Sequence, residues 1–215
     1  MGQTARVNVS RPAPAPPAAY GRDADTYDRR TASYQRYRRD AVDALPLRRG
    51  DVVLDVGCGT GLCFEHLLEK VGPTGHVIGV DGAAPMVELA AERVDDHGWE
   101  NVTLVTAPVE DASIPGTADA ALFCATHDVL QSPAALENVV GHLRPGAWVA
   151  ASGGKWAPRW KAALNLVSRA VHEPFVTSFD GFERPWSLLA ETVDDLQVTE
   201  VALGGGYVAV GRVAG

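Results

Sequence analysis

Residues 52–61 read Val-Val-Leu-Asp-Val-Gly-Cys-Gly-Thr-Gly, and this stretch decides the fold. The apolar residues at its start predict a strand that is buried on both faces of a parallel sheet. Asp55 interrupts them and must face a cleft, water or a cation, because an unpaired buried carboxylate is costly. The glycines that follow predict a tight turn with bare backbone, and residues 62–71 continue as a helix. Together they predict a strand, turn and helix that bind a nucleotide.

The spacing of the glycines indicates which nucleotide binds. A dinucleotide-binding turn needs a glycine at the sixth position of the pattern G-x-G-x-x-G; counted from Gly57, that position is Leu62 in this chain. An acid two positions before the first glycine suits a ligand with a cationic end better than a pyrophosphate. The pattern Asp-x-Gly-x-Gly-x-Gly resembles motif I of class I S-adenosylmethionine-dependent methyltransferases, and a chance occurrence is the alternative. The resemblance implies that the residues of this loop bind the cofactor: Asp55, Gly57, Cys58, Gly59 and Gly61.

Composition sets further limits. The 215 residues, of which 46% are hydrophobic and 21% are charged, suit one globular domain. A net charge of -8 argues against nucleic acid as a partner. Three cysteines without a C-x-x-C pair indicate a reducing compartment. The absence of a long apolar run or signal core predicts a cytoplasmic protein without stable membrane insertion. Six scattered histidines indicate no metal site, and a homodimer is left open.

The amino-terminal region divides into a tail and a lid. Residues 1–19 are rich in Pro and Ala and are expected to be disordered. Residues 20–46 carry tyrosines and arginines at helical spacing, and residues 47–215 follow as the methyltransferase domain. The resemblance implies lid helices in which Tyr27 and Arg38 contact the cofactor while Tyr20 and Tyr34 face the acceptor. The alternative is a helix whose tyrosines only pack on the core.

The second and third strands are expected at residues 76–80 and 102–105. Asp81 ends the second strand 24 residues after Gly57 and should bind the ribose hydroxyls. The resemblance adds Gly82 and Met86 as cofactor contacts, Met86 against the adenine, although packing alone would also explain this methionine. After the third strand, Pro108 occupies the position where many relatives have an acid. Adenine recognition then falls to the Val109 backbone and Glu110.

The fourth strand, expected at residues 118–125, leads into a Thr-His-Asp sequence. Class I enzymes place motif IV here, so Cys124 and Ala125 are expected along the cofactor. His127 and Asp128 are expected to face the acceptor. His127 is the best general base by residue type, because its unperturbed pKa lies near neutral pH. The alternative is that His127 bonds locally and only shapes the pocket.

The remaining elements complete the expected sheet. A helix at 133–143, a strand at 147–152, a helix at 160–171 and strands at 198–203 and 207–213 follow. This order predicts an α/β fold: a doubly wound, mostly parallel seven-stranded sheet with an antiparallel last strand and helices on both faces. Residues 153–190 should form the acceptor pocket. Its candidates are Glu173 as an acid or base, and four substrate contacts: Trp156, His172, Phe179 and Trp186.

The predicted function is methyl transfer from S-adenosylmethionine to a small molecule, such as an amine or an indole or other aromatic ring of a natural product. The Tyr-x-x-Tyr-Arg segment at residues 34–38 and Gly-Trp-x-Asn-Val-x-Leu at residues 98–104 resemble small bacterial phosphatidylethanolamine and betaine-lipid N-methyltransferases. A nicotinamide-dependent reductase and a catalytically silent S-adenosylmethionine-binding subunit are the alternatives.

Overall fold

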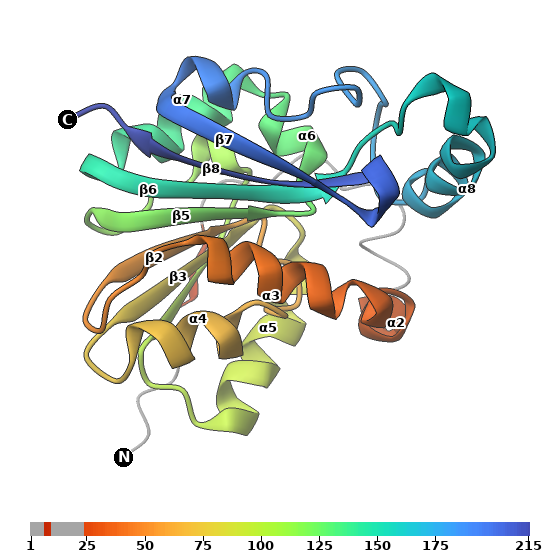
Figure 1. Cartoon of the computed structure of the whole chain (residues 1–215). Helices are drawn as coiled ribbons and strands as arrows, with labels where there is room; N and C mark the ends of the chain where they lie inside the picture. Colours follow the sequence, from red (N-terminus) through yellow and green to blue (C-terminus); the bar gives the residue numbers. More distant parts are fainter. Residues whose placement is uncertain (1–6, 10–23) are drawn as a thin grey trace.

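The computed structural model of the chain describes residues 7–9 and 24–215. These residues build one eight-stranded sheet in the order β1-β4-β3-β2-β5-β6-β8-β7 (Figure 1). β8 is antiparallel to both of its neighbours, β6 and β7, and all other strand pairs are parallel. The strands are β1 (Val7–Val9), β2 (Val52–Val56), β3 (His76–Asp81), β4 (Val102–Thr106), β5 (Ala118–Cys124), β6 (Leu143–Gly154), β7 (Val193–Val201) and β8 (Gly206–Val213).

Helices connect and cover these strands. The α-helices are α2 (Ala24–Arg30), α3 (Gln35–Ala44), α4 (Phe64–Val71), α5 (Ala84–His97), α6 (His127–Leu130), α7 (Pro133–Gly141) and α8 (Ala162–His172). Short 3-10 turns include η1 (Ala32–Tyr34), η2 (Val109–Asp111) and η4 (Leu189–Glu191). Each of the described helices is too short or too polar to cross a bilayer.

Two apolar cores lie on opposite faces of the sheet, because successive strand residues point to opposite sides. On one face Val53 belongs to a core with residues of α3, α4 and α5. On the other face its neighbour Leu54 belongs to a core with residues of η2, α6, α7 and η4. The result is three layers, with the sheet in the middle.

The predicted sheet is confirmed in its seven main strands and its antiparallel strand β8. The expectation of a disordered tail is wrong at residues 7–9, which form β1 and pair with β4 at the sheet edge; the rest of the tail lies outside the described residues. The helix expected from Leu62 begins at Phe64. The strand expected at 198–203 lies at 193–201, because Ala202 and Leu203 have positive φ and turn the chain into β8.

The topology fixes where a ligand can bind. β2 lies between β3 and β5. The chain continues from β2 to β3 and β4 on one side and then returns to β5 on the other side, so the strand order reverses at β2. The crevice at the carboxyl ends of such strands is the usual ligand site of open α/β sheets. Helices α2 and α8 both lie at the end of the sheet where β6 ends (Figure 1).

Candidate active site

The three glycines of the loop after β2 have different roles, although all have positive φ. A Cβ on Gly57 would lie 2.4 Å from Cγ2 of Thr126, so this glycine lets the loop pass against the end of β5. A Cβ on Gly61 would lie 2.5 Å from the ring of Phe64, so it makes room for a core side chain. Gly59 borders a cleft of about 230 Å³ and leaves bare backbone there. Gly61 is not among the residues lining this cleft, so the structure does not bring it together with the other loop residues that were expected to bind the cofactor.

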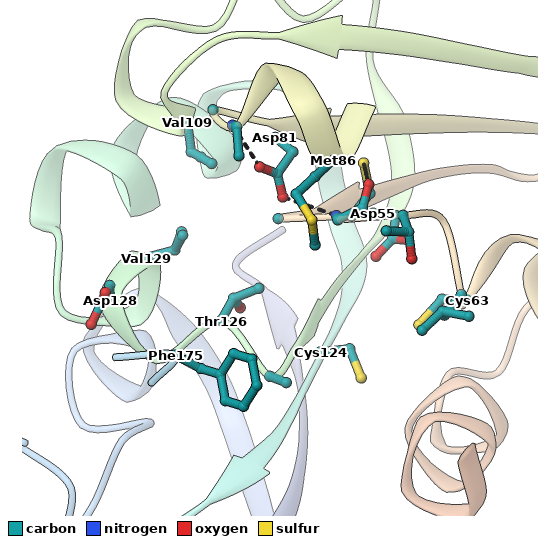
Figure 2. A pocket seen from close by; sticks show the side chains of 18 of the residues that line it. Asp55, Cys63, Asp81, Met86, Val109, Cys124, Thr126, Asp128, Val129 and Phe175 are labelled. Carbon is teal, nitrogen blue, oxygen red and sulfur yellow. Dashed lines mark hydrogen bonds between the residues drawn. The ribbon is translucent and has the colours of Figure 1, made fainter. Parts of the chain in front are cut away.

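Asp81 is held by the backbone at the end of β3. One carboxylate oxygen accepts from the N–H of Gly59 at 2.9 Å, and the other accepts from the N–H of Ala83 at 2.8 Å (Figure 2). Burial raises the pKa of Asp81, and these two bonds oppose that rise. Each oxygen has a second lone pair, so the carboxylate can still accept from vicinal hydroxyls. This arrangement suits a ribose.

A buried acid and a buried cation lie on the same cleft wall. Asp55 is 1% exposed, and its Oδ2 has no hydrogen-bond partner among the described residues. Burial raises the pKa of Asp55 well above its ordinary value. Arg38 is 5% exposed and donates to neutral oxygens of Thr31 and Gln35, with no carboxylate within 4.0 Å in the described part of the chain. The pair suits a zwitterionic amino-acid group, because an ammonium beside Asp55 would favour the ionised form of its carboxyl.

The far end of the cleft is largely apolar. Met86 is 1% exposed and lines the cleft together with Pro108, Val109 and Val129. Glu110 and Gly82 also line the cleft, as expected from the sequence. The carbonyl of Val109 accepts from the Asn138 side chain at 2.7 Å, which fixes the loop after β4. The flat face of an aromatic ring such as a purine fits this end.

The end of β5 separates the cleft from a second, larger cavity of about 670 Å³. Cys124 and Ala125 line both spaces, and Ala125 has a φ of 58°. Such a φ is costly outside glycine and is often found at functional sites. A hydrogen bond with the Cys63 thiol lowers the pKa of Cys124 to about 7, and the Ser152 hydroxyl acts in the same direction. Seven residues belong to both walls: Tyr27, Arg38, Cys124, Ala125, Thr126, His127 and Phe175.

His127 is tied to its surroundings. Its Nε2 lies 3.0 Å from the carbonyl oxygen of Asp180, which can only accept, so Nε2 donates. Its Nδ1 is buried without a partner among the described residues. Burial lowers the pKa of His127. The carboxylate of Asp128 accepts from the N–H of Thr177 at 3.0 Å. Both side chains therefore hold residues 175–180 in place beside the site by hydrogen bonds. This is the alternative stated for His127 above, in which it bonds locally and shapes the pocket.

The larger cavity contains only part of the predicted acceptor set. Tyr34 and His172 line it, and Tyr20 lies outside the described residues. Glu173 lines neither cavity; its side chain is 64% exposed beside Arg169, so its expected role as acid or base is wrong.

Three predicted aromatic contacts also lie outside the two cavities. Trp156 stacks on Phe179 with ring centroids 5.1 Å apart. Trp186 is 8% exposed and packs on Tyr207 in the core. The structure therefore does not place these three side chains in the cavity predicted for the acceptor, and Phe182 lines it instead.

The sequence did not reveal a polar clamp between α2 and the glycine loop. Asp28 accepts from the Thr60 hydroxyl at 2.7 Å and forms an ion pair with Arg93 of α5. Arg93 also donates to the Thr60 carbonyl at 2.8 Å. These residues are widely separated along the chain, and no spacing pattern relates them. The clamp holds α2 over the cofactor end of the site.

The family comparison agrees with this geometry. Residues 53–146 match the model of a family described as methyltransferase domain. Residues 53–146 are thus similar to a methyltransferase domain, and the sheet has the fold of solved methyltransferases. A solved structure with this fold is a SAM-dependent methyltransferase from Aquifex aeolicus, with a TM-score of 0.62, 20% identity, and coverage of 89% of this chain and 97% of that one.

Two curated relatives share part of the methyltransferase domain. Aklanonic acid methyltransferase DauC of Streptomyces sp. (strain C5) is 37% identical over 46% of this chain and 44% of its own length. Demethylmenaquinone methyltransferase of Anoxybacillus flavithermus is 37% identical over 38% of this chain and 36% of its own length. The chain therefore spans less than half of the length of either relative. Neither relative is of the lipid N-methyltransferase type that the sequence suggested.

The site residues fit S-adenosylmethionine. The orphaned Oδ2 of Asp55 and the guanidinium of Arg38 would hold the ammonium and carboxylate of its methionine end. Asp81 would hold the ribose, and bare backbone at Gly59 leaves room beside it. Among the described residues no group of three or more metal-binding side chains is present.

Proposed function

We propose that this methyltransferase moves a methyl group from S-adenosylmethionine in the smaller cleft to a small molecule in the larger cavity. The observation that carries the proposal is the shared wall between the two spaces. A ligand in the cleft and an acceptor in the cavity would meet at the end of β5, where Cys124 and Ala125 border both. The net charge of -8 supports a small acceptor over a nucleic acid.

The chain's own groups would act mainly by positioning. The sulfonium of S-adenosylmethionine supplies an electrophilic methyl group. Asp81, Asp55 and Arg38 fix the donor from one side, and the aromatic residues Tyr27 and Phe175 cover the wall shared with the acceptor. Their ring centroids lie 5.8 Å apart and edge to face, a favourable geometry for an aromatic pair. Holding two reactants in line supplies much of the acceleration in such a reaction.

The test combines binding with turnover. Purified protein is titrated with S-adenosylmethionine and with NAD in a calorimeter, and is then incubated with S-adenosylmethionine and a panel of hydroxylated and amino aromatic compounds. The proposal expects binding of S-adenosylmethionine alone and acceptor-dependent release of S-adenosylhomocysteine. Binding of NAD would support the reductase alternative. Tight cofactor binding with no turnover across the panel would support the silent subunit.

A further inference from the structure

The large apolar side chains that are exposed in the described residues gather in one region. Each has between 40% and 80% of its surface exposed, and together we call them the α8 patch: Trp160, Leu166, Val167, Val171 and Leu203. The first four belong to α8 or to the short turn η3 (Arg159–Lys161) before it, and the last belongs to the turn η5 (Ala202–Gly204). Single exposed apolar residues are ordinary, but a cluster of them marks an interaction surface.

Direct contacts join the η5 turn to the start of α8. The ammonium of Lys161 donates to the carbonyl of Leu203 at 2.5 Å and lies 4.8 Å from the centre of the Trp160 ring. Figure 1 shows α8 at the edge of the molecule, beyond the end of β6. Two segments that are far apart in the sequence therefore contribute to one surface.

α8 is oriented with its polar side toward the protein. Ser168 is 7% exposed, and the Asn165 side chain bonds to the N–H and the carbonyl of Ala157 at 2.7 and 3.0 Å. The apolar residues at helical spacing are exposed instead: Ala163, Leu166, Val167, Ala170 and Val171. A surface helix normally buries its apolar stripe in the core. The reversed orientation of α8 therefore indicates a binding surface.

The η5 turn places a leucine where a polar residue or glycine would be usual. Ala202 and Leu203 have φ of 51° and 57°. This conformation is costly for residues other than glycine, asparagine and aspartate. Leu203 is 79% exposed, so packing in the core does not offset that cost. An apolar medium outside the protein would accommodate this side chain.

The charge around the α8 patch is positive. Residues 156–172 contain three Lys or Arg residues and no Asp or Glu, in a chain with 27 acidic and 19 basic residues. Arg159 and Lys161 form no ion pair within 4.0 Å among the described residues. The third, Arg169, lies 4.0 Å from the carboxylate of Glu173. The patch thus combines apolar side chains with two positive charges that lack a nearby carboxylate in the described part of the chain.

This combination fits an anionic lipid surface better than a second copy of the chain. A two-fold interface brings the same patch of both copies together, so two surfaces of like charge would meet. Apolar and aromatic side chains beside Lys and Arg are typical of segments that lie in the headgroup region of a bilayer. The headgroup phosphates supply negative charge, and the acyl boundary takes up the apolar side chains. Such docking is peripheral and needs no helix that spans the bilayer.

We propose that the α8 patch docks this protein on an anionic membrane surface, with Trp160 and Leu203 at the acyl boundary and Arg159 and Lys161 at the phosphates. Val171 belongs to this patch and also lines the larger cavity. Docking therefore brings one wall of that cavity close to the lipid. The proposal concerns a surface outside the cofactor cleft and does not rest on the proposed function.

The test is sedimentation of the full-length protein with lipid vesicles. One set contains about equal parts of phosphatidylglycerol and phosphatidylcholine, and the other contains phosphatidylcholine alone. The protein should bind the anionic vesicles about tenfold or more tightly than the neutral ones, and added salt should weaken the binding. Because Trp160 leaves water on docking, tryptophan emission should shift to shorter wavelength with the anionic vesicles.

Two paired substitutions separate the apolar contribution from the charge. Trp160→Ala with Leu203→Asn should reduce affinity for the anionic vesicles about tenfold or more and abolish the emission shift. Asparagine keeps the η5 turn, because it tolerates positive φ. Arg159→Gln with Lys161→Gln should reduce the affinity about fivefold for each charge removed. Denaturant titration should show that both variants unfold as the wild type does.

Arg48→Gln with Arg49→Gln is the matched control for charge. Both residues are exposed just before β2, at the end of the sheet opposite to α8, and this variant should bind vesicles as the wild type does. The proposal is overturned if the wild type does not bind the anionic vesicles, if neutral vesicles bind equally well, or if Trp160→Ala with Leu203→Asn keeps wild-type affinity.

Light scattering distinguishes docking on lipid from self-association. A dimer that Trp160→Ala with Leu203→Asn disperses, in a protein that does not bind vesicles, would assign the α8 patch to a second copy and overturn the proposal. Calorimetry with S-adenosylhomocysteine is read separately. Vesicle binding by a protein that does not bind this compound would contradict the proposed function and support the docking surface.

Discussion

The backbone N–H of Gly59 donates to the carboxylate of Asp81 at 2.9 Å, and this bond joins the glycine loop to the end of the neighbouring strand. The second carboxylate oxygen is held by the N–H of Ala83 at 2.8 Å. The loop that leaves β2 and the turn that leaves β3 are thus positioned by one side chain. A ligand that reaches Asp81 meets an acceptor whose orientation is already fixed.

Asp81→Asn should weaken cofactor binding about 10- to 100-fold, the usual worth of hydrogen bonds to a charged group. In the wild type, two backbone N–H groups donate to the Asp81 carboxylate. The side-chain NH2 of the variant would face one of them, and two donors cannot hydrogen-bond to each other. Calorimetric titration with S-adenosylhomocysteine measures the effect. Asp96→Asn, an exposed acid on α5, is the control and should bind as wild type does. Equal affinity of the Asp81 variant would rule out the ribose assignment.

Asp55→Asn should change how stability depends on pH. The pKa of Asp55 is raised in the folded state, so as pH rises past the ordinary aspartate pKa the unfolded chain ionises first. Ionisation then favours the unfolded state until pH passes the folded pKa. The free energy of unfolding of Asp55→Asn should therefore rise relative to wild type across that window, in denaturant titrations without cofactor. If the difference in free energy of unfolding between variant and wild type did not change with pH, the pKa of Asp55 would not be raised in the folded state. The same variant should lose cofactor affinity.

Arg93→Met should loosen α2 from the glycine loop. It removes the ion pair with Asp28 and the bond to the Thr60 carbonyl. Both partners of the ion pair are partly exposed, so we expect a loss of only about two- to fivefold in cofactor affinity. Hydrogen exchange of residues 24–34 should become faster. Arg36→Met is the control, since the Arg36 side chain is 85% exposed and its ion pair within the described residues is with Asp40 on the same helix. Unchanged exchange in the Arg93 variant would contradict the clamp.

Trp186→Ala should act on folding. Trp186 is 8% exposed and its ring centroid lies 4.7 Å from that of Tyr207. Truncation of such a buried aromatic costs about 3–5 kcal/mol of the free energy of unfolding. Trp160→Ala, at a residue that is 80% exposed, should cost about 0.5 kcal/mol or less. Denaturant titration checks both. If the Trp186 variant kept wild-type stability and lost turnover, the prediction that Trp186 contacts the substrate would be supported instead.

Much of the smaller cleft could be predicted from the sequence because the signals for it are local. Asp55 and the glycines lie within one short stretch, and Asp81 follows at the interval of one helix. Strand and helix periodicities predicted the sheet for the same reason. The short strand β1 was not predicted, because the residues that follow it are rich in proline and alanine.

The residues that line the larger cavity could not be predicted from local sequence patterns. In the irregular segment after α8, Phe182 faces the cavity while Phe179 stacks on Trp156 and Trp186 enters the core. No periodicity distinguishes aromatic residues in such a segment. The exposure of Glu173 and the binding of His127 to the Asp180 carbonyl also depend on how that segment folds back.

Calorimetric titration of the purified protein with S-adenosylmethionine tests the central claim most directly. The account predicts saturable binding to one site, which Asp81→Asn weakens about 10- to 100-fold and Asp96→Asn leaves unchanged. A folded protein that gives no binding heat with S-adenosylmethionine or S-adenosylhomocysteine would contradict the account.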